Sequence, residues 1–207
     1  MKKEILGLLI VLSFFSIIFT GCLENTSKKE TINYALNSSI LNLDDLPEGY
    51  IKWSEESNYS NHSHKDTIFG IKPLEFYFVT FAYEPEMNNA FPAIALYLYR
   101  FNSSSDAKLI THNLSEQVSS SLNNTLNRTT PPNVSQIGDE SIYELFEGNM
   151  GEYYGYQNAT WSNIHFRIEN ITVYLLLEGV MEWDINYVEL TLEYARIIED
   201  RINKMLS

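Results

Sequence analysis

The chain has 207 residues, 14 of them basic and 27 acidic, so its formal net charge at neutral pH is −13. An acidic chain of this kind repels nucleic acid, and we therefore exclude DNA or RNA binding. Fourteen tyrosines and eleven phenylalanines favour a fold rich in β-sheet. The single cysteine excludes a zinc site built from several cysteines.

The first residues have the pattern of a secretory signal. Lys2 and Lys3 form a short positive start, and an uncharged apolar run extends from Ile5 to Phe19. The run is slightly short for a comfortable span of a bilayer. It is followed by Thr-Gly-Cys, and residues 19–22 together resemble the lipobox of prokaryotic lipoproteins, with Phe19 in place of the usual leucine.

This resemblance implies that residues 1–21 are a signal peptide and that Cys22 becomes the lipidated first residue of the mature chain. Lipidation also accounts for a lone thiol in an exported protein, because that thiol has no disulfide partner. The alternative is an uncleaved N-terminal helix with an incidental cysteine. Both interpretations place the remaining chain on the extracytoplasmic face of the cell membrane, and we favour the lipid anchor.

A second compositional signal is an excess of Asn-x-Ser/Thr, the acceptor pattern for N-linked glycans. Eleven of the twenty asparagines fit it, whereas chance would give about three. The alternative is a composition rich in Asn and Ser, but we favour a glycosylated surface protein. Together with the lipobox, the pattern resembles proteins of an archaeal cell envelope. The candidate acceptors are Asn25, Asn37, Asn58, Asn61, Asn102, Asn113, Asn123, Asn127, Asn133, Asn158 and Asn170.

The elements of the first half follow in chain order. Residues 22–39 are polar and predict a tether, and one domain is expected over residues 40–207. A turn at Pro-Glu-Gly precedes a short strand over residues 50–54. The apolar, aromatic-rich runs at 74–83 and 93–101 predict an antiparallel pair of strands.

An amphipathic helix is predicted next. The run Ser103-Ser104-Ser105 offers an N-cap, and the apolar residues after it recur at three- and four-residue spacing. The polar stretch 123–133 is interpreted as an exposed loop. The predicted buried side chains of the helix are Ala107, Ile110, Leu114, Val118 and Leu122.

The second half predicts more strands and a last helix. Strands are expected at 142–146, 153–156, 161–168 and 171–177, and Asn170 is expected to take the positive φ of the tight turn between the last two. Asp184 can cap the final helix. The predicted buried stripe of that helix is Ile185, Val188, Leu192, Ala195, Ile198 and Ile202.

This order predicts an α+β fold, in which an antiparallel β-sheet packs against two main helices as an α/β sandwich, preceded by the signal helix. Three phrases occur together, DLPEGY at 45–50, IGDES at 137–141 and FRIENITV at 166–173. They are similar to small extracytoplasmic lipoprotein domains of the PsbP-like and LpqN-like type. The resemblance implies a binding or accessory role without shared catalytic residues.

Two clusters are candidates for a metal or ligand site. His62 and His64 are alternate residues of an extended segment, so both imidazoles could contact one ion; the alternative is a solvated polar loop. His112 and His165 are expected to be structural. An aromatic cluster is a candidate patch for sugars or apolar ligands, the alternative being strand core. It comprises Tyr153, Tyr154, Tyr156 and Trp161.

The sequence shows no nucleotide-binding glycine loop and no Gly-x-Ser-x-Gly elbow. We expect a lipid-anchored, non-catalytic binding or accessory module at the cell surface, without a cofactor, with an envelope protein or a small ligand as partner. One alternative is an extracytoplasmic hydrolase that uses His62 and His64 or the carboxylate pairs at 44–45, 55–56 and 139–140. The other is a structural component of the envelope.

Overall fold

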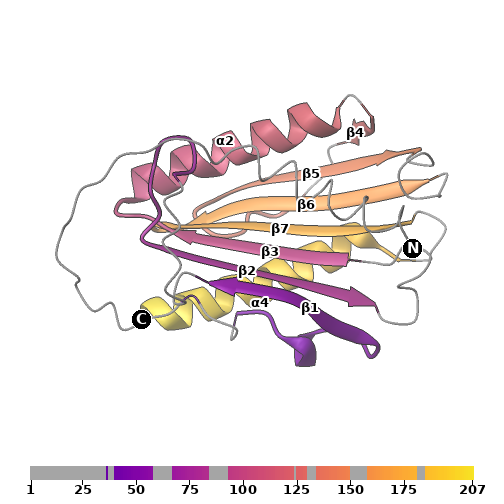
Figure 1. Cartoon of the computed structure of the whole chain (residues 1–207), viewed down its shortest axis with the longest axis horizontal. Helices are drawn as coiled ribbons and strands as arrows, with labels where there is room; N and C mark the ends of the chain where they lie inside the picture. The colour runs from indigo at the N-terminus through magenta and orange to yellow at the C-terminus, as the bar shows by residue number, and fades with distance from the viewer. Residues whose placement is uncertain are drawn as a thin grey trace.

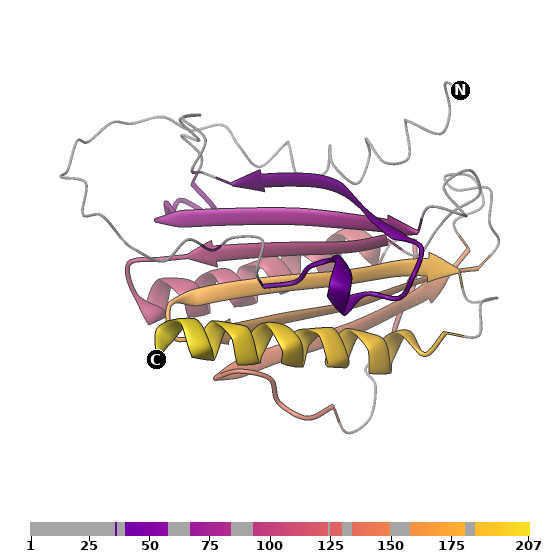
Figure 2. The same cartoon turned by 90° about the horizontal axis from the view of Figure 1, so that it is seen from below.

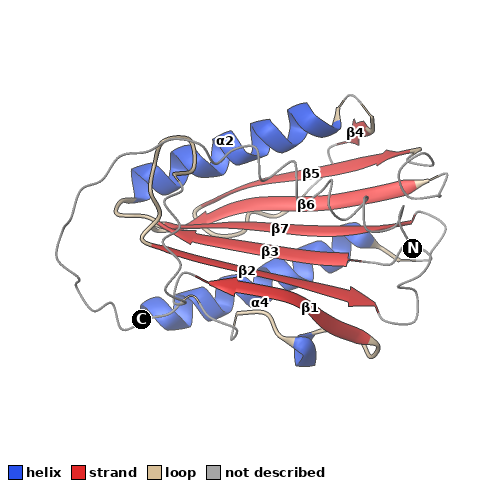
Figure 3. Cartoon of the chain, in the orientation of Figure 1, coloured by secondary structure: helices blue, strands red, loops and turns tan. Residues whose placement is uncertain are grey.

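The computed structural model describes residues 36, 40–57, 67–83, 93–123, 125–129, 134–149, 158–180 and 185–207. Within them the chain forms a seven-stranded antiparallel sheet in the order β1-β2-β3-β7-β6-β5-β4 (Figure 1). Two long helices accompany the sheet (Figure 3), so the predicted α+β fold is confirmed. The elements are η1 (Leu43–Asp45), β1 (Tyr50–Ser57), β2 (Glu75–Tyr83), β3 (Ala93–Arg100), α2 (Ser104–Leu122), β4 (Asn127–Thr129), β5 (Glu140–Gly148), β6 (Ala159–Ile168), β7 (Ile171–Val180) and α4 (Tyr187–Leu206).

The central strands are apolar on both faces because a helix covers each face. Alternate residues of a strand point to opposite sides of a sheet, so each central strand contributes to two cores. Helix α4 packs on β6 and β7 from one side, and α2 packs on the same two strands from the other. Figure 2 shows α4 on the viewer's side of the strands, with α2 behind them.

The α4-side core is almost entirely aliphatic and aromatic. Its strand residues include Val79, Leu96 and Leu175, each fully buried. The segment before β1 also joins this core, since Ile40, Leu41 and the isolated Leu36 pack there. Arg201 of α4 holds that segment with a bidentate ion pair to Asp45, at 2.6 Å for both bonds, and donates a third bond to the Ile40 carbonyl.

The α2-side core contains a row of stacked rings that crosses four strands. The rings of Phe78 and Tyr97 lie 4.4 Å apart, those of Tyr97 and Tyr174 lie 5.5 Å apart, and those of Tyr174 and His165 lie 4.4 Å apart. Directly paired positions in the ladder place these side chains next to one another.

Helix α2 matches its prediction in start and buried face. Ser103 is the N-cap, and its hydroxyl accepts from the amide of Asp106 at 3.1 Å. All five predicted apolar residues are buried. The polar stretch after it differs from the prediction, because residues 127–129 form the edge strand β4. All three of its side chains are exposed, so no alternation of apolar residues marks it in the sequence.

The last helix confirms three residues of its predicted buried stripe, Ala195, Ile198 and Ile202, and departs from the prediction in its first turns. Asp184 lies outside the described residues, and Asn186 is the N-cap, with its side chain accepting from the amide of Glu189 at 3.2 Å. Ile185 is exposed, whereas Val188 and Leu192 are only half-buried. The buried face comprises Tyr187, Thr191, Tyr194, Ala195, Ile198 and Ile202. The first part of the stripe was wrong because the Thr191 hydroxyl is buried through a hydrogen bond to the Tyr187 carbonyl, which an apolar pattern does not reveal.

The turn between β6 and β7 also corrects a prediction. Glu169, rather than Asn170, has the positive φ, at 51°. The side-chain amide of Asn170 instead binds the chain after β3, where its Nδ2 donates to the Phe101 carbonyl at 2.6 Å. The Asn170 carbonyl in turn accepts from the Phe101 amide at 2.9 Å. Asn170 thus fixes the chain between β3 and α2, and Glu169 takes the strained position.

Candidate functional site

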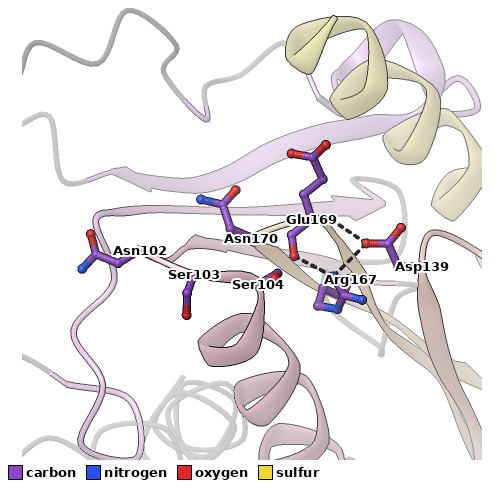
Figure 4. Close-up of a pocket in the computed structure, with 7 residues that line it drawn as sticks. All are labelled: Asn102, Ser103, Ser104, Asp139, Arg167, Glu169 and Asn170. Atoms are coloured by element: carbon purple, nitrogen blue, oxygen red, sulfur yellow. Dashed lines mark hydrogen bonds and ion pairs between the residues drawn. The ribbon is translucent and has the colours of Figure 1, made fainter.

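A polar hollow of about 410 Å³ lies at the end of the sheet where α2 begins (Figure 4). The turn after β6, the residues before β5 and the first residues of α2 meet there. Its walls are therefore held by three elements that are distant in the sequence. The lining residues are Asn102, Ser103, Ser104, Asp139, Arg167, Glu169 and Asn170.

Arg167 is the centre of this hollow. Its Nη1 donates to Asp139 Oδ2 and to the Glu169 carbonyl, both at 2.7 Å, and its Nε donates to Glu140 at 3.3 Å. Asp139 Oδ2 also accepts from the Glu169 amide at 2.8 Å. Because two carboxylates neutralise the one guanidinium, the hollow has no net positive charge to attract an anion.

The IGDES phrase explains how this junction is built. Gly138 has a φ of +63°, and a Cβ on it would lie 2.3 Å from the Arg167 carbonyl oxygen. The Asp139 amide donates to that same carbonyl at 2.8 Å, and the Gly138 amide donates to Glu199 of α4 at 2.6 Å. Only glycine therefore allows this close approach between the start of β5 and the end of β6.

The hollow offers hydrogen-bonding groups but no nucleophile with a base. The Ser103 hydroxyl already accepts from the helix and lies 2.9 Å from the hydroxyl of Ser105. Among the residues that the structure describes, no histidine lines the hollow. A nucleophilic mechanism needs a serine within hydrogen-bonding reach of a base, and that geometry is missing here. The amides of Asn102 and Asn170, the hydroxyl of Ser104 and the carboxylates suit a polar, neutral or cationic ligand.

A second polar group is buried beneath α2, around Glu144 of β5. This carboxylate is fully buried and accepts from Ser119, whose hydroxyl contacts Oε1, and from Ser115 at 3.3 Å. Asn163 Nδ2 donates to Oε2 at 3.3 Å. Arg128 of β4 reaches Oε1 at 2.8 Å from a side chain that is 41% exposed. The charge of Glu144 is thus balanced by one arginine from the short edge strand.

His165 lies beside this carboxylate but does not act as its ionic partner. Burial lowers the pKa of His165 to about 3, so the imidazole is neutral and the 3.9 Å separation from Glu144 is not an ion pair at neutral pH. The Asn163 amide nitrogen can only donate, so His165 Nε2, at 3.3 Å, accepts from it. The ring hydrogen therefore resides on Nδ1. No serine contacts the imidazole, and the cluster is not a catalytic triad.

The carboxylate pairs proposed for hydrolysis lie apart in the fold. Asp45 is bound to Arg201, and Glu55 is bound to Lys52 and Tyr77 on β1. Asp139 lies at the hollow. These pairs do not converge on one cleft within the described ranges. The described part of the chain also contains no group of three His, Cys, Asp or Glu side chains placed to hold a metal ion.

Most other candidate residues lie outside the described ranges. This applies to Cys22, to His62 and His64, and to Tyr153, Tyr154 and Tyr156, so these predictions stand as they were made. Trp161 is described, and it is buried in the α2-side core. His112 is exposed on α2.

The glycan acceptors can be compared where they are described. None of the six described acceptor asparagines is buried, although the non-acceptor Asn163 is. They are Asn102, Asn113, Asn123, Asn127, Asn158 and Asn170; Asn25, Asn37, Asn58, Asn61 and Asn133 lie outside the described ranges. Their accessibility is compatible with glycosylation, which stays a prediction.

No described helix is both long enough and apolar enough to cross a membrane.

Sequence reasoning missed the hollow as a site, although two of the three phrases it singled out contribute to it. Asp139 comes from the IGDES phrase, and Arg167, Glu169 and Asn170 come from FRIENITV. The signal was thus present as turn residues next to charged ones. Asn102 and Ser104 join them only because β3 ends beside the turn of β6 and β7.

Neither a protein-family model nor a curated protein sequence matches the chain. Among solved structures, the chain is similar to the extracellular domain of PknH from Mycobacterium tuberculosis, with a TM-score of 0.50 and 13% sequence identity. The match covers 82% of this chain and 93% of that domain. At this identity the similarity shows a shared fold alone. It agrees with the α+β sandwich, whereas the PsbP-like or LpqN-like assignment and the lipoprotein assignment stay predictions.

Proposed function

We propose that this protein is a lipid-anchored, non-catalytic binding or accessory module on the extracytoplasmic face of the cell membrane. The observation that carries the binding role is the hollow at the end of the sheet, where hydrogen-bonding groups converge without a nucleophile and base. Its ligand is small and polar, and it is neutral or cationic because Asp139 and Glu140 offset the charge of Arg167.

The location rests on the sequence before the described fold. Residues 1–21 have the charged start and apolar run of a signal, and Cys22 closes a lipobox-like sequence. The similarity to a domain described as extracellular supports the same side of the membrane. We propose residues 22–39 as the tether and residues 40–207 as the domain, with Leu36 of the tether already seated in the α4-side core.

Lipid anchoring is tested by fractionating membranes from cells that express the full chain. The wild-type protein should remain with the membrane after a high-salt wash, and its intact mass should include the lipid on Cys22. A Cys22→Ser variant should lose that mass and should either leave the membrane or retain the uncleaved residues 1–21. A wild-type chain with a free Cys22 thiol would contradict the lipid anchor.

Ligand binding is tested by thermal unfolding of the mature chain with a panel of sugars, polyols and small amines. A ligand at one hundred times its Kd adds about 2.7 kcal/mol of stability. Asn102→Ala should abolish the shift, because Asn102 is exposed in the hollow, and Asn158→Ala, exposed at the start of β6, is the matched control. Loss of the shift in both variants, or turnover of any panel compound, would contradict the proposal.

A further inference from the structure

A tight hairpin before β2 carries an exposed phenylalanine in a strained conformation. Ile68 and Ile71 exchange two backbone hydrogen bonds, at 2.8 and 2.9 Å, so Phe69 and Gly70 are the two turn residues. Both have positive φ, at 49° and 82°. A two-residue turn of this kind favours Asn or Gly at its first position, and a bulky residue there is an outlier.

Burial of the Phe69 side chain does not compensate for this backbone strain. The side chain is 40% exposed, although Ile68 beside it is buried in the α2-side core. Leu74, five residues later, is 44% exposed, and Lys72 between them is also exposed. Two large apolar side chains therefore face outward at the start of β2, and a strained residue held in place indicates a use for it.

The tether reaches the fold at the same end of the sheet. Leu36 is buried, and its amide donates to the carboxylate of Glu75, the first residue of β2. Thirteen residues, 23–35, separate Leu36 from Cys22. Thirteen residues of random coil have an end-to-end distance of about 20 Å, so a chain of this length places a lipid on Cys22 within reach of this end of the domain.

We propose that Phe69 and Leu74 contact the lipid surface in which Cys22 is anchored, and that this contact sets the orientation of the domain. The inference rests on the proposed lipid anchor. An aromatic and an aliphatic side chain with a lysine between them suit the interface of a bilayer, where the ring and the leucine enter the apolar boundary and the methylene stem of the lysine lies along it. The hollow lies at this same end of the sheet. The Leu74 amide donates to the Arg100 carbonyl, and Phe101, which follows Arg100, donates its amide to the carbonyl of Asn170 in the hollow.

The contact is tested on the lipidated full-length mature chain in phosphatidylcholine vesicles. With Cys22 lipidated, a Lys72→Cys substitution provides the only free thiol, which is labelled with an environment-sensitive dye. We expect the dye emission to shift to the blue and to be quenched by a quencher embedded in the bilayer. Thr125→Cys is the control, because Thr125 is exposed beyond the opposite end of α2; its dye should behave as in water.

A second variant separates membrane contact from folding. Asparagine tolerates the positive φ at position 69, so Phe69→Asn should fold with an unchanged or slightly higher midpoint of thermal unfolding. In the Lys72→Cys background it should lower the bilayer quenching about threefold. An unchanged quenching in Phe69→Asn, or equal signals from the labels at 72 and 125, would overturn the inference.

The result also distinguishes this inference from the anchor on which it rests. If intact mass shows a free Cys22, the anchor itself fails. If Cys22 is lipidated and the dye at position 72 remains in water, only the contact fails. A dye that shifts on native membranes but not on protein-free vesicles would assign the surface to a protein partner and would also overturn the lipid contact.

Discussion

The two faces of the sheet are covered by helices of similar length, but the polar groups buried under the two helices differ. Where α4 crosses β6 the buried polar atoms belong to a neutral cluster, in which Ser162 lies 2.5 Å from the Thr191 hydroxyl and donates to the Tyr187 carbonyl at 3.1 Å. The buried ion pair of Glu75 and Arg100 on the same face lies away from this contact, where β2 begins and β3 ends. On the α2 side a buried carboxylate and a neutral imidazole lie at the centre of the contact. The α4 side therefore gains stability from burial, whereas the α2 side loses part of that gain to desolvation.

Unsatisfied polar atoms show the same difference. Among the described residues, His165 Nδ1, Asn163 Oδ1 and Trp161 Nε1 on the α2-facing side of β6 are buried without a hydrogen-bond partner, as is Gln117 Oε1 of α2 itself. On the α4 side the Tyr194 hydroxyl oxygen and Arg100 Nε are such atoms, although Arg100 pairs with Glu75 through Nη1. Each buried polar atom without a partner costs about 1–3 kcal/mol. We therefore expect α2 to be the helix that separates first from the sheet.

The largest expected effect is acid instability on the α2 side. The folded pKa of His165 is about 3, against an ordinary value of 6.5, so below pH 6.5 the unfolded chain binds a proton that the folded chain does not. The free energy of unfolding should then fall by about 4–5 kcal/mol from this residue as the pH drops from about 6.5 to 3. His165→Phe should remove this part of the slope in denaturant unfolding between pH 7 and 4.

His112, exposed on the outer face of α2, provides the control for that slope. His112→Gln should leave the pH dependence unchanged. The Glu144 carboxylate and the Tyr174 phenol also face His165, and burial raises the pKa of Tyr174, so that phenol does not titrate in this range. An equal slope in wild type and His165→Phe would show that the imidazole is not buried as described.

The next prediction compares the stability lost when one buried isoleucine on each face is truncated to leave a cavity. Ile198 of α4 and Ile110 of α2 are both fully buried. Ile198→Ala should cost about 3 kcal/mol, and Ile110→Ala should cost about 2 kcal/mol, because a helix seated partly on polar groups can shift to fill the void. Chemical denaturation measures both values. A larger cost for Ile110→Ala would reverse the comparison of the two faces.

A smaller effect is expected from the arginine that balances Glu144. Arg128→Met should cost about 2 kcal/mol, near the low end for a broken buried ion pair because the Arg128 side chain is 41% exposed and water can reach the carboxylate. Adding Glu144→Gln should restore part of the loss. Lys52→Met, which removes an exposed ion pair to Glu55, is the control and should change stability by less than about 0.5 kcal/mol.

The smallest effect concerns the ion pair on the α4 side. Burial acts against the charge of Asp45, but its hydrogen bonds to Arg201 and the Asn42 amide and the charge of Arg201 outweigh burial, so the pKa of Asp45 lies below its usual 3.8. This pair should contribute about 1 kcal/mol above pH 4, and the contribution should be lost as the pH falls through the lowered value. Arg201→Gln should remove it. A loss already complete at pH 6 would contradict this assignment.

Local pattern was enough for much of the fold. Strands β2, β3, β6 and β7 and the buried face of α2 were predictable. The spacing of apolar residues, every second residue in a strand and every three or four in a helix, is visible among neighbouring residues. The edge strand β4 was not, since its pairing with β5 comes from proximity and not from an apolar pattern. The candidate site was predictable only as turn residues, since Asn102 and Arg167 meet through strand order.

The sequence by itself predicted an export signal and a lipid anchor and determined the class of fold, because each depends on composition or on short-range periodicity. Only the tertiary structure decided that Glu144 and His165 are buried together. In the sequence both occupy alternating positions that could equally have faced water, and the crossing of α2 removes them from solvent. Burial, charge balance and the lining of a hollow depend on which elements meet, and that information is not local.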